Sequence, residues 1–273
     1  MDLFSCFDCC RKEVDDERSE SQHIPALFYE HAVIHKPVIW KWVYCLHVAM
    51  HKGHSPASAW LSRKAIIGVD LCCGPMVHHA AVLSGFLESV YLADPIEENR
   101  RALCSWLDGD PGCLDHDPFL AMVAKVEELP ETIGVNFITT RLRKAVRGVL
   151  QSSFHHPYVL PKCHGASAFD VVLLMTRTLE TFCSDADSYA AVIRRVNFLL
   201  PIGGLLILVG VLGRTASNVT MRPATKETLE TALLNSGFGN LQWYLKNLDP
   251  RPCSHGVYSY LLLSNKLWGM QMS

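Results

Sequence analysis

Acidic and amide side chains follow two consecutive apolar runs in the first half of the sequence. Asp70 lies near the end of the first run, residues 65–71, and Gly74 comes just after it; Asp94 follows the second run, with Asn99 one helical turn further on. A glycine lets backbone N–H groups approach a ligand closely, because it has no side chain. A carboxylate about 20 residues downstream of such a loop can accept two ribose hydroxyls. These positions therefore predict a site for a nucleoside-like ligand.

The elements that must position these residues are predicted by hydrophobic periodicity. Strands are expected at residues 65–71, 89–93, 169–175 and 205–212, helices at 76–86, 96–107, 139–150, 188–200 and 226–236, and a closing antiparallel pair at 240–247 and 257–264. Alternating strands and helices indicate parallel βαβ units. The expected fold class is therefore α/β, a doubly wound sheet whose ligand crevice opens at the carboxyl ends of the strands.

The N-terminal part of the chain has a different pattern. Residues 1–22 predict a flexible tail, and residues 37–51 a helix with one apolar face. In the tail Cys6, Cys9 and Cys10 admit three interpretations: a weak lipid anchor through S-acylation, a lone C-x-x-C metal site, or incidental thiols. His47 and His51 lie on one face of the predicted helix, but no H-E-x-x-H arrangement or cysteine pair completes a zinc site. We interpret them as surface or capping histidines.

Composition limits the class of partner. Of the 273 residues 49% are hydrophobic and 19% charged, the formal net charge is −2, and no basic stripe is present. A small-molecule substrate is therefore expected rather than nucleic acid or a membrane surface. No apolar run reaches the roughly 18 residues of a membrane span. The eleven cysteines are odd in number and lack a framework spacing, which indicates reduced thiols in the cytoplasm. We expect one large domain, residues 23–273, and a monomer.

Three segments occur in the order and at the spacing of a known family. Residues 69–75, Val-Asp-Leu-Cys-Cys-Gly-Pro, are similar to a D-x-G-x-G-P loop; residues 94–99, Asp-Pro-Ile-Glu-Glu-Asn, to D-x-x-x-x-N; and residues 199–205, Leu-Leu-Pro-Ile-Gly-Gly-Leu, to L-L-K-P-G-G-x. The sequence thereby resembles, over about residues 25–265, the class I S-adenosylmethionine-dependent methyltransferases that include the nicotinamide, phenylethanolamine, indolethylamine and thioether methyltransferases.

The resemblance implies a Rossmann-like, seven-stranded sheet, mostly parallel with a C-terminal antiparallel hairpin. It also implies a helical lid at residues 23–64 before the core of residues 65–273. S-adenosyl-L-methionine would bind with its methionine part over residues 72–74, its ribose on Asp94 and Asn99, and its adenine near Ser153 and Phe154. The full set of implied donor-binding residues is Tyr29, Asp70, Cys72, Gly74, Pro75, His78, Asp94, Asn99, Ser153, Phe154 and Thr176. Metals have no implied role.

The acceptor implied by the resemblance is a small nitrogen compound of the pyridine or amine type, with Glu180 as an acid that orients it; Asp185 and Asp187 are further candidates for that role. Methyl transfer needs positioning more than acid–base help. We therefore expect no certain catalytic residue.

Three departures from the family pattern bear on activity. Cys72 replaces the first loop glycine, which we expect to be tolerated only if its φ is not positive. Ser153 replaces an acid that would accept the adenine amino group, and Gly210 an acid near the acceptor. Two hypotheses remain in competition: an active small-molecule N-methyltransferase, and an impaired member that binds the donor or regulates. An unrelated nucleotide-binding α/β protein is a third.

Overall fold

A computed structural model describes residues 26, 30, 36–51, 66–161, 169–174, 178–183, 185–212, 224–247 and 258–268. The tail of residues 1–22, with Cys6, Cys9 and Cys10, lies outside these ranges, as do Tyr29 and Thr176. The proposed domain boundaries stay a prediction. Within the described ranges no helix is long and apolar enough to cross a membrane.

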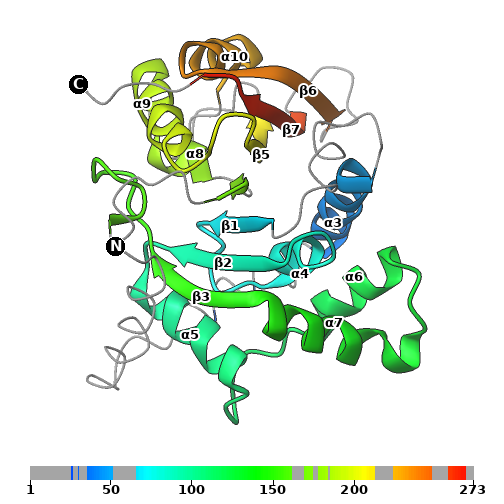
Figure 1. Cartoon of the computed structure of the whole chain (residues 1–273). Coiled ribbons are helices and arrows are strands. Elements are labelled where there is room, and N and C mark those ends of the chain that lie inside the picture. The colour runs from blue at the N-terminus through cyan, green and yellow to red at the C-terminus, as the bar shows by residue number, and fades with distance from the viewer. Residues whose placement is uncertain are drawn as a thin grey trace.

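A seven-stranded sheet forms the centre of the molecule (Figure 1). Its strands are β1 (Ile67–Leu71), β2 (Ser89–Asp94), β3 (Val146–Gln151), β4 (Val171–Leu174), β5 (Leu205–Leu212), β6 (Phe238–Asn247) and β7 (Tyr258–Lys266). They lie in the order β3-β2-β1-β4-β5-β7-β6, in which β1 to β5 pair in parallel and β7 pairs antiparallel with β5 and β6. The doubly wound, mostly parallel sheet with an antiparallel C-terminal pair is thereby confirmed.

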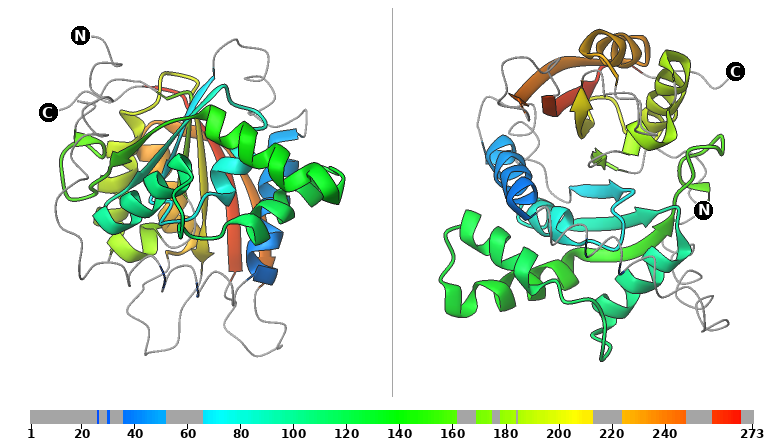
Figure 2. Two further views of the ribbon diagram at one scale, coloured as in Figure 1. Left: turned by 90° about the horizontal axis from the view of Figure 1, so that it is seen from below. Right: turned by 180° about the vertical axis from the view of Figure 1, so that it is seen from behind.

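Helices cover both faces of this sheet (Figures 1 and 2). One face carries α3 (Lys36–His51), α4 (His78–Leu83), α5 (Glu97–Asp108), α6 (Asp117–Val126) and α7 (Glu131–Ala145); the other carries α8 (Thr178–Phe182), α9 (Ala186–Asn197) and α10 (Lys226–Asn235). The chain winds from β1 outward to β3, then returns to place β4 on the other side of β1. The carboxyl ends of β1 and β4 therefore lie where strand order reverses, which is where ligands bind in doubly wound sheets.

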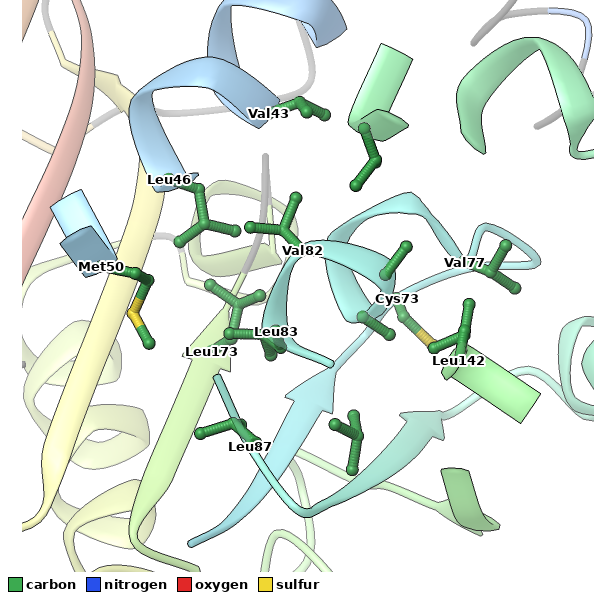
Figure 3. Close-up of a cluster of buried hydrophobic side chains, with 14 of the residues drawn as sticks. Val43, Leu46, Met50, Cys73, Val77, Val82, Leu83, Leu87, Leu142 and Leu173 are labelled. Atoms are coloured by element: carbon green, nitrogen blue, oxygen red, sulfur yellow. The ribbon is translucent and has the colours of Figure 1, made fainter. Parts of the chain in front are cut away.

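Successive side chains of the strands point to opposite faces of the sheet, so they contribute to two separate buried clusters. Leu173 on β4 faces α3 and α4, whereas Val172 and Leu174 face the cluster under α9 and α10. Figure 3 shows the first cluster, in which Leu46 of α3 lies near Val82 of α4. Both layers are needed because a parallel sheet buries its two faces.

One predicted element is wrong. Residues 139–150 were expected to form a single helix, but α7 ends at Ala145 and β3 begins at Val146. The spacing of Leu142, Val146 and Val149 suits one face of a helix. In the structure Leu142 belongs to α7, whereas Val146 and Val149 are partly buried residues of the edge strand β3. Helix α6 and the first half of α7 were not predicted.

Arg141 joins three helices on the α3–α7 face. Its guanidinium contacts both carboxylate oxygens of Glu127 at 2.6 Å, beyond the end of α6. It also donates to Ser84 Oγ and to the carbonyl of Ala81, both at 3.0 Å, at the end of α4. This partly buried cluster holds α4, which directly follows the loop after β1, against α7.

Lys266 connects the C-terminal strand β7 to the end of α9. Its ammonium donates to the carbonyls of Asn197 at 2.9 Å and Leu200 at 2.7 Å, where α9 ends. Burial lowers the pKa of this lysine. The final strand β7 thus supplies the C-terminal cap of α9.

Candidate functional site

The loop after β1 approaches the end of β2. The N–H groups of Cys72 and Cys73 donate to the carbonyl of Ala93 at 2.6 and 3.3 Å. Gly74 has φ +61°, and a Cβ built on it would meet no atom within 4 Å. A glycine is therefore favoured by conformation there, while the space beside it is open.

Asp94 connects this loop to the start of α5. Its buried carboxylate accepts the N–H of Gly74 at 2.8 Å on Oδ2, and the N–H of Ile96 and Nδ2 of Asn99, both at 2.9 Å, on Oδ1. Burial raises the pKa of Asp94, and the three hydrogen bonds oppose that shift. Asp94 thus supports the start of α5 and keeps one acceptor position on Oδ2.

Asn99 supplies a second acceptor beside it. Its Oδ1 is buried and has no hydrogen-bond partner. A buried polar oxygen without a partner is costly, which favours a ligand donor at this point. The structure therefore brings the predicted Gly74, Asp94 and Asn99 together as one hydrogen-bonded unit.

Cys72 adopts φ +56°, so the condition for tolerating a side chain at this position, a φ that is not positive, is not met. Its Sγ lies 4.0 Å from Ser152 Oγ. Burial, and then the charge of Asp94, raise the pKa of the thiol well above 9, so it stays protonated. The side chain therefore extends across the end of β2 toward β3 at a backbone conformation that disfavours any residue with a Cβ.

Replacing Cys72 by glycine is expected to raise the free energy of unfolding by about 1 kcal/mol, because the left-handed conformation then costs little. Urea denaturation measures the change. Asn240→Gly is the matched control: Asn240 has φ +54°, but asparagine tolerates this region, so its gain should be about 0.3 kcal/mol or less. A Cys72→Gly protein less stable than wild type would contradict the prediction.

Two histidines begin the helix that follows the loop. His78 is 2% exposed and stacks on Phe119, with the ring centroids 5.4 Å apart. Burial lowers its pKa well below 6.5. The neighbouring His79, which the sequence analysis did not single out, places Nδ1 3.7 Å from Oδ2 of Asp70. Its position in the first turn of the helix after the β1 loop could have identified His79 as a candidate from the sequence.

Asp70 is fully buried beneath the loop, and neither of its carboxylate oxygens accepts a hydrogen bond. Burial raises its pKa, whereas His79 lowers it. The pair therefore fixes the end of β1 to the start of α4.

His116, also buried, gives the fold a pH dependence. Its ring meets Trp106 edge-on, and burial lowers its pKa to about 4. Between pH 4 and the ordinary value of 6.5, the unfolded chain binds a proton that the folded chain refuses. This histidine's contribution to stability is therefore present above pH 6.5 and is lost as the pH falls toward 4.

On lowering the pH from about 7.5 to about 5, wild type should lose about 2 kcal/mol more of its unfolding free energy than His116→Phe. Urea titrations at the two pH values measure this difference, and the other buried groups remain as a common background. Equal losses in the two proteins would contradict the prediction.

The segment after β3 forms a compact loop over residues 152–161. The Ser153 N–H donates to the carbonyl of Val159 at 2.8 Å, and Ser153 Oγ accepts the N–H of His156 at 3.3 Å. Phe154 is 2% exposed and lies 5.0 Å from the ring of Phe182. The contact to the β1 loop comes from Ser152, whose Oγ contacts Cys72 Sγ, whereas the hydrogen bonds of Ser153 described above are to its own loop.

The acceptor-side predictions are only partly described. Glu180 lies on α8, but its side chain is outside the described part of the structure. Asp185 forms a capping box with Ser188 at the start of α9, which gives it a structural role. Gly210 is buried in β5 opposite Tyr260 of β7.

The two histidines on α3 also have a local explanation. The rings of His47 and His51 lie 4.3 Å apart, and both meet Phe86 edge-on. Among the described residues, no group of three or more His, Cys, Asp or Glu side chains is placed to hold a metal ion.

A sequence model of the NNMT/PNMT/TEMT family matches residues 61–250, which hold β1 to β6 and the whole hydrogen-bonded unit around Asp94. The chain belongs to this family. The resemblance inferred from the loops at residues 69–75 and 94–99 is thereby confirmed.

Several relatives in the NNMT/PNMT/TEMT family are N-methyltransferases. Human phenylethanolamine N-methyltransferase is 26% identical over 175 residues, which cover 62% of this chain and 61% of that enzyme. Indolethylamine N-methyltransferase of Oryctolagus cuniculus is 27% identical over 180 residues, covering 62% and 65%. Human nicotinamide N-methyltransferase is 24% identical over 185 residues, covering 64% and 67%. The match to the phenylethanolamine enzymes thus spans less than two thirds of their length.

Solved structures place this chain in the Rossmann-like methyltransferase fold. An S-adenosylmethionine-dependent methyltransferase from Clostridium acetobutylicum superimposes with a TM-score of 0.52 at 11% identity, covering 89% of this chain and all of that one. A putative sarcosine dimethylglycine methyltransferase from Galdieria sulphuraria gives 0.50 at 10% identity, covering 79% and 85%. At these identities the likeness concerns the fold.

Proposed function

We propose that this protein is an S-adenosylmethionine-dependent methyltransferase that acts on a small-molecule nitrogen acceptor of the pyridine or amine type. The observation that carries the donor assignment is the unit formed by Gly74, Asp94 and Asn99, which leaves acceptors on Asp94 Oδ2 and Asn99 Oδ1 beside open space at Gly74. Membership of a family whose relatives include N-methyltransferases supports the reaction type.

The donor fits the residues present. A ribose has two adjacent hydroxyl donors. The two proposed acceptors are Asn99 Oδ1, which has no partner, and Asp94 Oδ2, which already accepts the Gly74 N–H; their side chains hydrogen-bond to each other. The open side of Gly74 leaves room for the methionine part. When bound, the donor supplies an activated methyl group on its sulfonium. Rate then depends on holding donor and acceptor in line, which is a task of positioning rather than of acid–base chemistry.

Within this proposal, the remaining predicted side chains have distinct tasks. Phe154, packed on Phe182, forms an apolar wall for the adenine, and Cys72 and Ser152 border the ribose. Asp70 holds the end of β1 and can balance a positive charge on the methionine part. Pro75, Thr176 and Tyr29 remain in the proposed set, with Glu180 as the acid that orients the acceptor.

Isothermal titration calorimetry with S-adenosylmethionine and S-adenosylhomocysteine tests the donor assignment. Binding of either compound is expected at micromolar to low millimolar concentration. Absence of heat for both would refute the proposal.

The open side of Gly74 gives a sharper test. Gly74→Ala should cost about 1 kcal/mol of stability because of its positive φ, yet weaken S-adenosylhomocysteine by about 20-fold or more, because the methyl group enters the space proposed for the ligand. Gly112→Ala is the control: Gly112 also has a positive φ, +85°, and open space around it, but lies in the turn between α5 and α6. The control should lose stability and keep its affinity. Equal affinities for the two variants would place the ligand elsewhere.

Cys72 favours a second candidate, a family member that binds the donor but turns over poorly. Its strained backbone and its side chain between the β1 loop and Ser152 narrow the proposed ribose site. Turnover assays against pyridines, amines and thioethers distinguish the two candidates. If Cys72→Gly binds the donor more tightly than wild type, the result would support the second candidate, a family member that turns over poorly.

A cytoplasmic, monomeric protein is part of the same proposal. The described cysteines, at positions 45, 72, 73, 104, 113 and 183, form no disulfide bond with one another, which suits a reducing compartment. Weak anchoring through Cys6, Cys9 and Cys10 is tested by labelling cells with a palmitate analogue; an unlabelled protein would exclude it.

A further inference from the structure

Arg195 makes an unusual contact for an arginine in the last turn of a helix. A basic residue there ordinarily interacts with the carbonyls of its own helix end. The guanidinium of Arg195, at the end of α9, instead donates to the backbone carbonyl of Phe154, in the loop after β3. Its neighbour Arg194 is exposed. One of two adjacent arginines is therefore committed to a long-range contact.

The loop held by Arg195 begins beside residues of the proposed donor site. At its start, the Ser152 N–H donates to the carbonyl of Asp94 at 3.3 Å, and Ser152 Oγ contacts Cys72 Sγ. Further along, Phe154 packs on Phe182 of α8. Figures 1 and 2 show the chain after β3 rising toward α9. The loop thus runs from the β1–β3 half of the sheet to helices that follow β4.

Internal hydrogen bonds make this loop a compact body. Ser153 bonds to Val159 and His156, and Tyr158 N–H donates to Nδ1 of His156 at 3.1 Å. Its attachment to the α8–α10 face includes buried apolar side chains, which are non-directional, and the bond to Arg195. A charged hydrogen bond to a fixed carbonyl sets position more strictly than apolar contact does.

We propose that Arg195 is a positioning residue for nucleobase binding: it fixes the Phe154 wall relative to the ribose acceptors on Asp94 and Asn99. This proposal rests on the donor assignment made above. It predicts that Arg195 affects every ligand with the base and ribose, whether or not the amino-acid part is present.

Two ligands separate a role at the base from a role at the amino-acid end of the donor. S-adenosylhomocysteine has all three parts, whereas 5′-methylthioadenosine lacks the amino-acid part. Arg195→Ala should weaken both by a similar factor of about 10, since a wall displaced by about 1 Å loses its fit to the base. Gly74→Ala, at the methionine end, should weaken S-adenosylhomocysteine much more than 5′-methylthioadenosine.

Arg194→Ala is the matched control, and both affinities should stay within about 2-fold of wild type. Arg195→Lys keeps a charged donor and should recover most of the loss. Hydrogen exchange gives a readout without ligand: the Ser153 amide should exchange faster in Arg195→Ala. If Arg195→Ala does not fold, Arg195→Gln, which keeps a shorter donor, serves for the same comparison.

The outcomes distinguish the two proposals. Failure of wild type to bind either compound would overturn the donor assignment and, with it, this role for Arg195. Binding by wild type with unchanged affinities in Arg195→Ala would overturn the role of Arg195 alone. A loss confined to S-adenosylhomocysteine would also overturn it, because the effect would then lie at the amino-acid end.

Discussion

Asp94→Ala should bind S-adenosylhomocysteine at least about 100-fold more weakly than wild type, because it removes the proposed ribose acceptor and also frees the Gly74 loop. The carboxylate accepts hydrogen bonds from Gly74, Ile96 and Asn99, so one substitution affects both sides of the site. Calorimetry below the melting temperature of the variant measures the affinity.

Asp94→Asn sharpens this test, since it keeps the size of the side chain. An amide has only one oxygen, so its NH₂ group would face either the Gly74 N–H or the Asn99 amide, and donor would meet donor. We expect a loss nearly as large as for alanine. Asp187→Ala, at an exposed acid in the first turn of α9, is the control and should bind normally. Retained affinity in Asp94→Ala would mean that the ribose lies elsewhere.

Arg141→Ala should lower the free energy of unfolding by about 3 kcal/mol, because it leaves the partly buried Glu127 carboxylate without its two-pronged partner. The bonds to Ser84 Oγ and the carbonyl of Ala81 are lost as well. Urea denaturation measures the loss. Donor affinity should change by about 2-fold or less, since the contact between His79 of α4 and Asp70 of β1 is retained.

An exposed ion pair provides the comparison for Arg141. Glu230 lies 3.7 Å from Lys226 on α10, with 35% of its side chain exposed, so Glu230→Ala should cost about 0.5 kcal/mol or less. If Arg141→Ala lowered the free energy of unfolding by no more than Glu230→Ala does, the Arg141 cluster would stabilise the fold no more than an exposed ion pair.

Much of the fold could be predicted because its strands are continuous apolar runs. The run at residues 205–212 coincides with β5, and α3 and α10 begin within one residue of their predicted positions. The edge strand β3 was missed because only one of its residues, Leu150, is fully buried, so it carries too weak an alternation to compete with a helical period. Its partner β2 is what makes it a strand.

The site was predictable only where its residues follow a strand end at a known spacing. Asp94 and Asn99 satisfied that condition, and their hydrogen bond is direct. The roles of Ser152, His79 and Arg195 depend on contacts between distant segments, and no local pattern encodes such contacts. The positive φ of Cys72 could not be predicted from the sequence, because hydrogen bonds from the Cys72 and Cys73 N–H groups to the distant carbonyl of Ala93 hold the turn.

The position of β7 has a consequence for biosynthesis. It is the last strand along the sequence, yet it lies between β5 and β6, and β6 has no other strand partner in the described sheet. During translation, β5 and β6 must therefore leave the ribosome with unpaired edges and wait for residues 258–266. Lys266, which caps α9, arrives at the same moment. Chaperone demand should accordingly fall on chains whose residues 238–247 have left the ribosome but whose residues 258–266 have not yet joined the sheet.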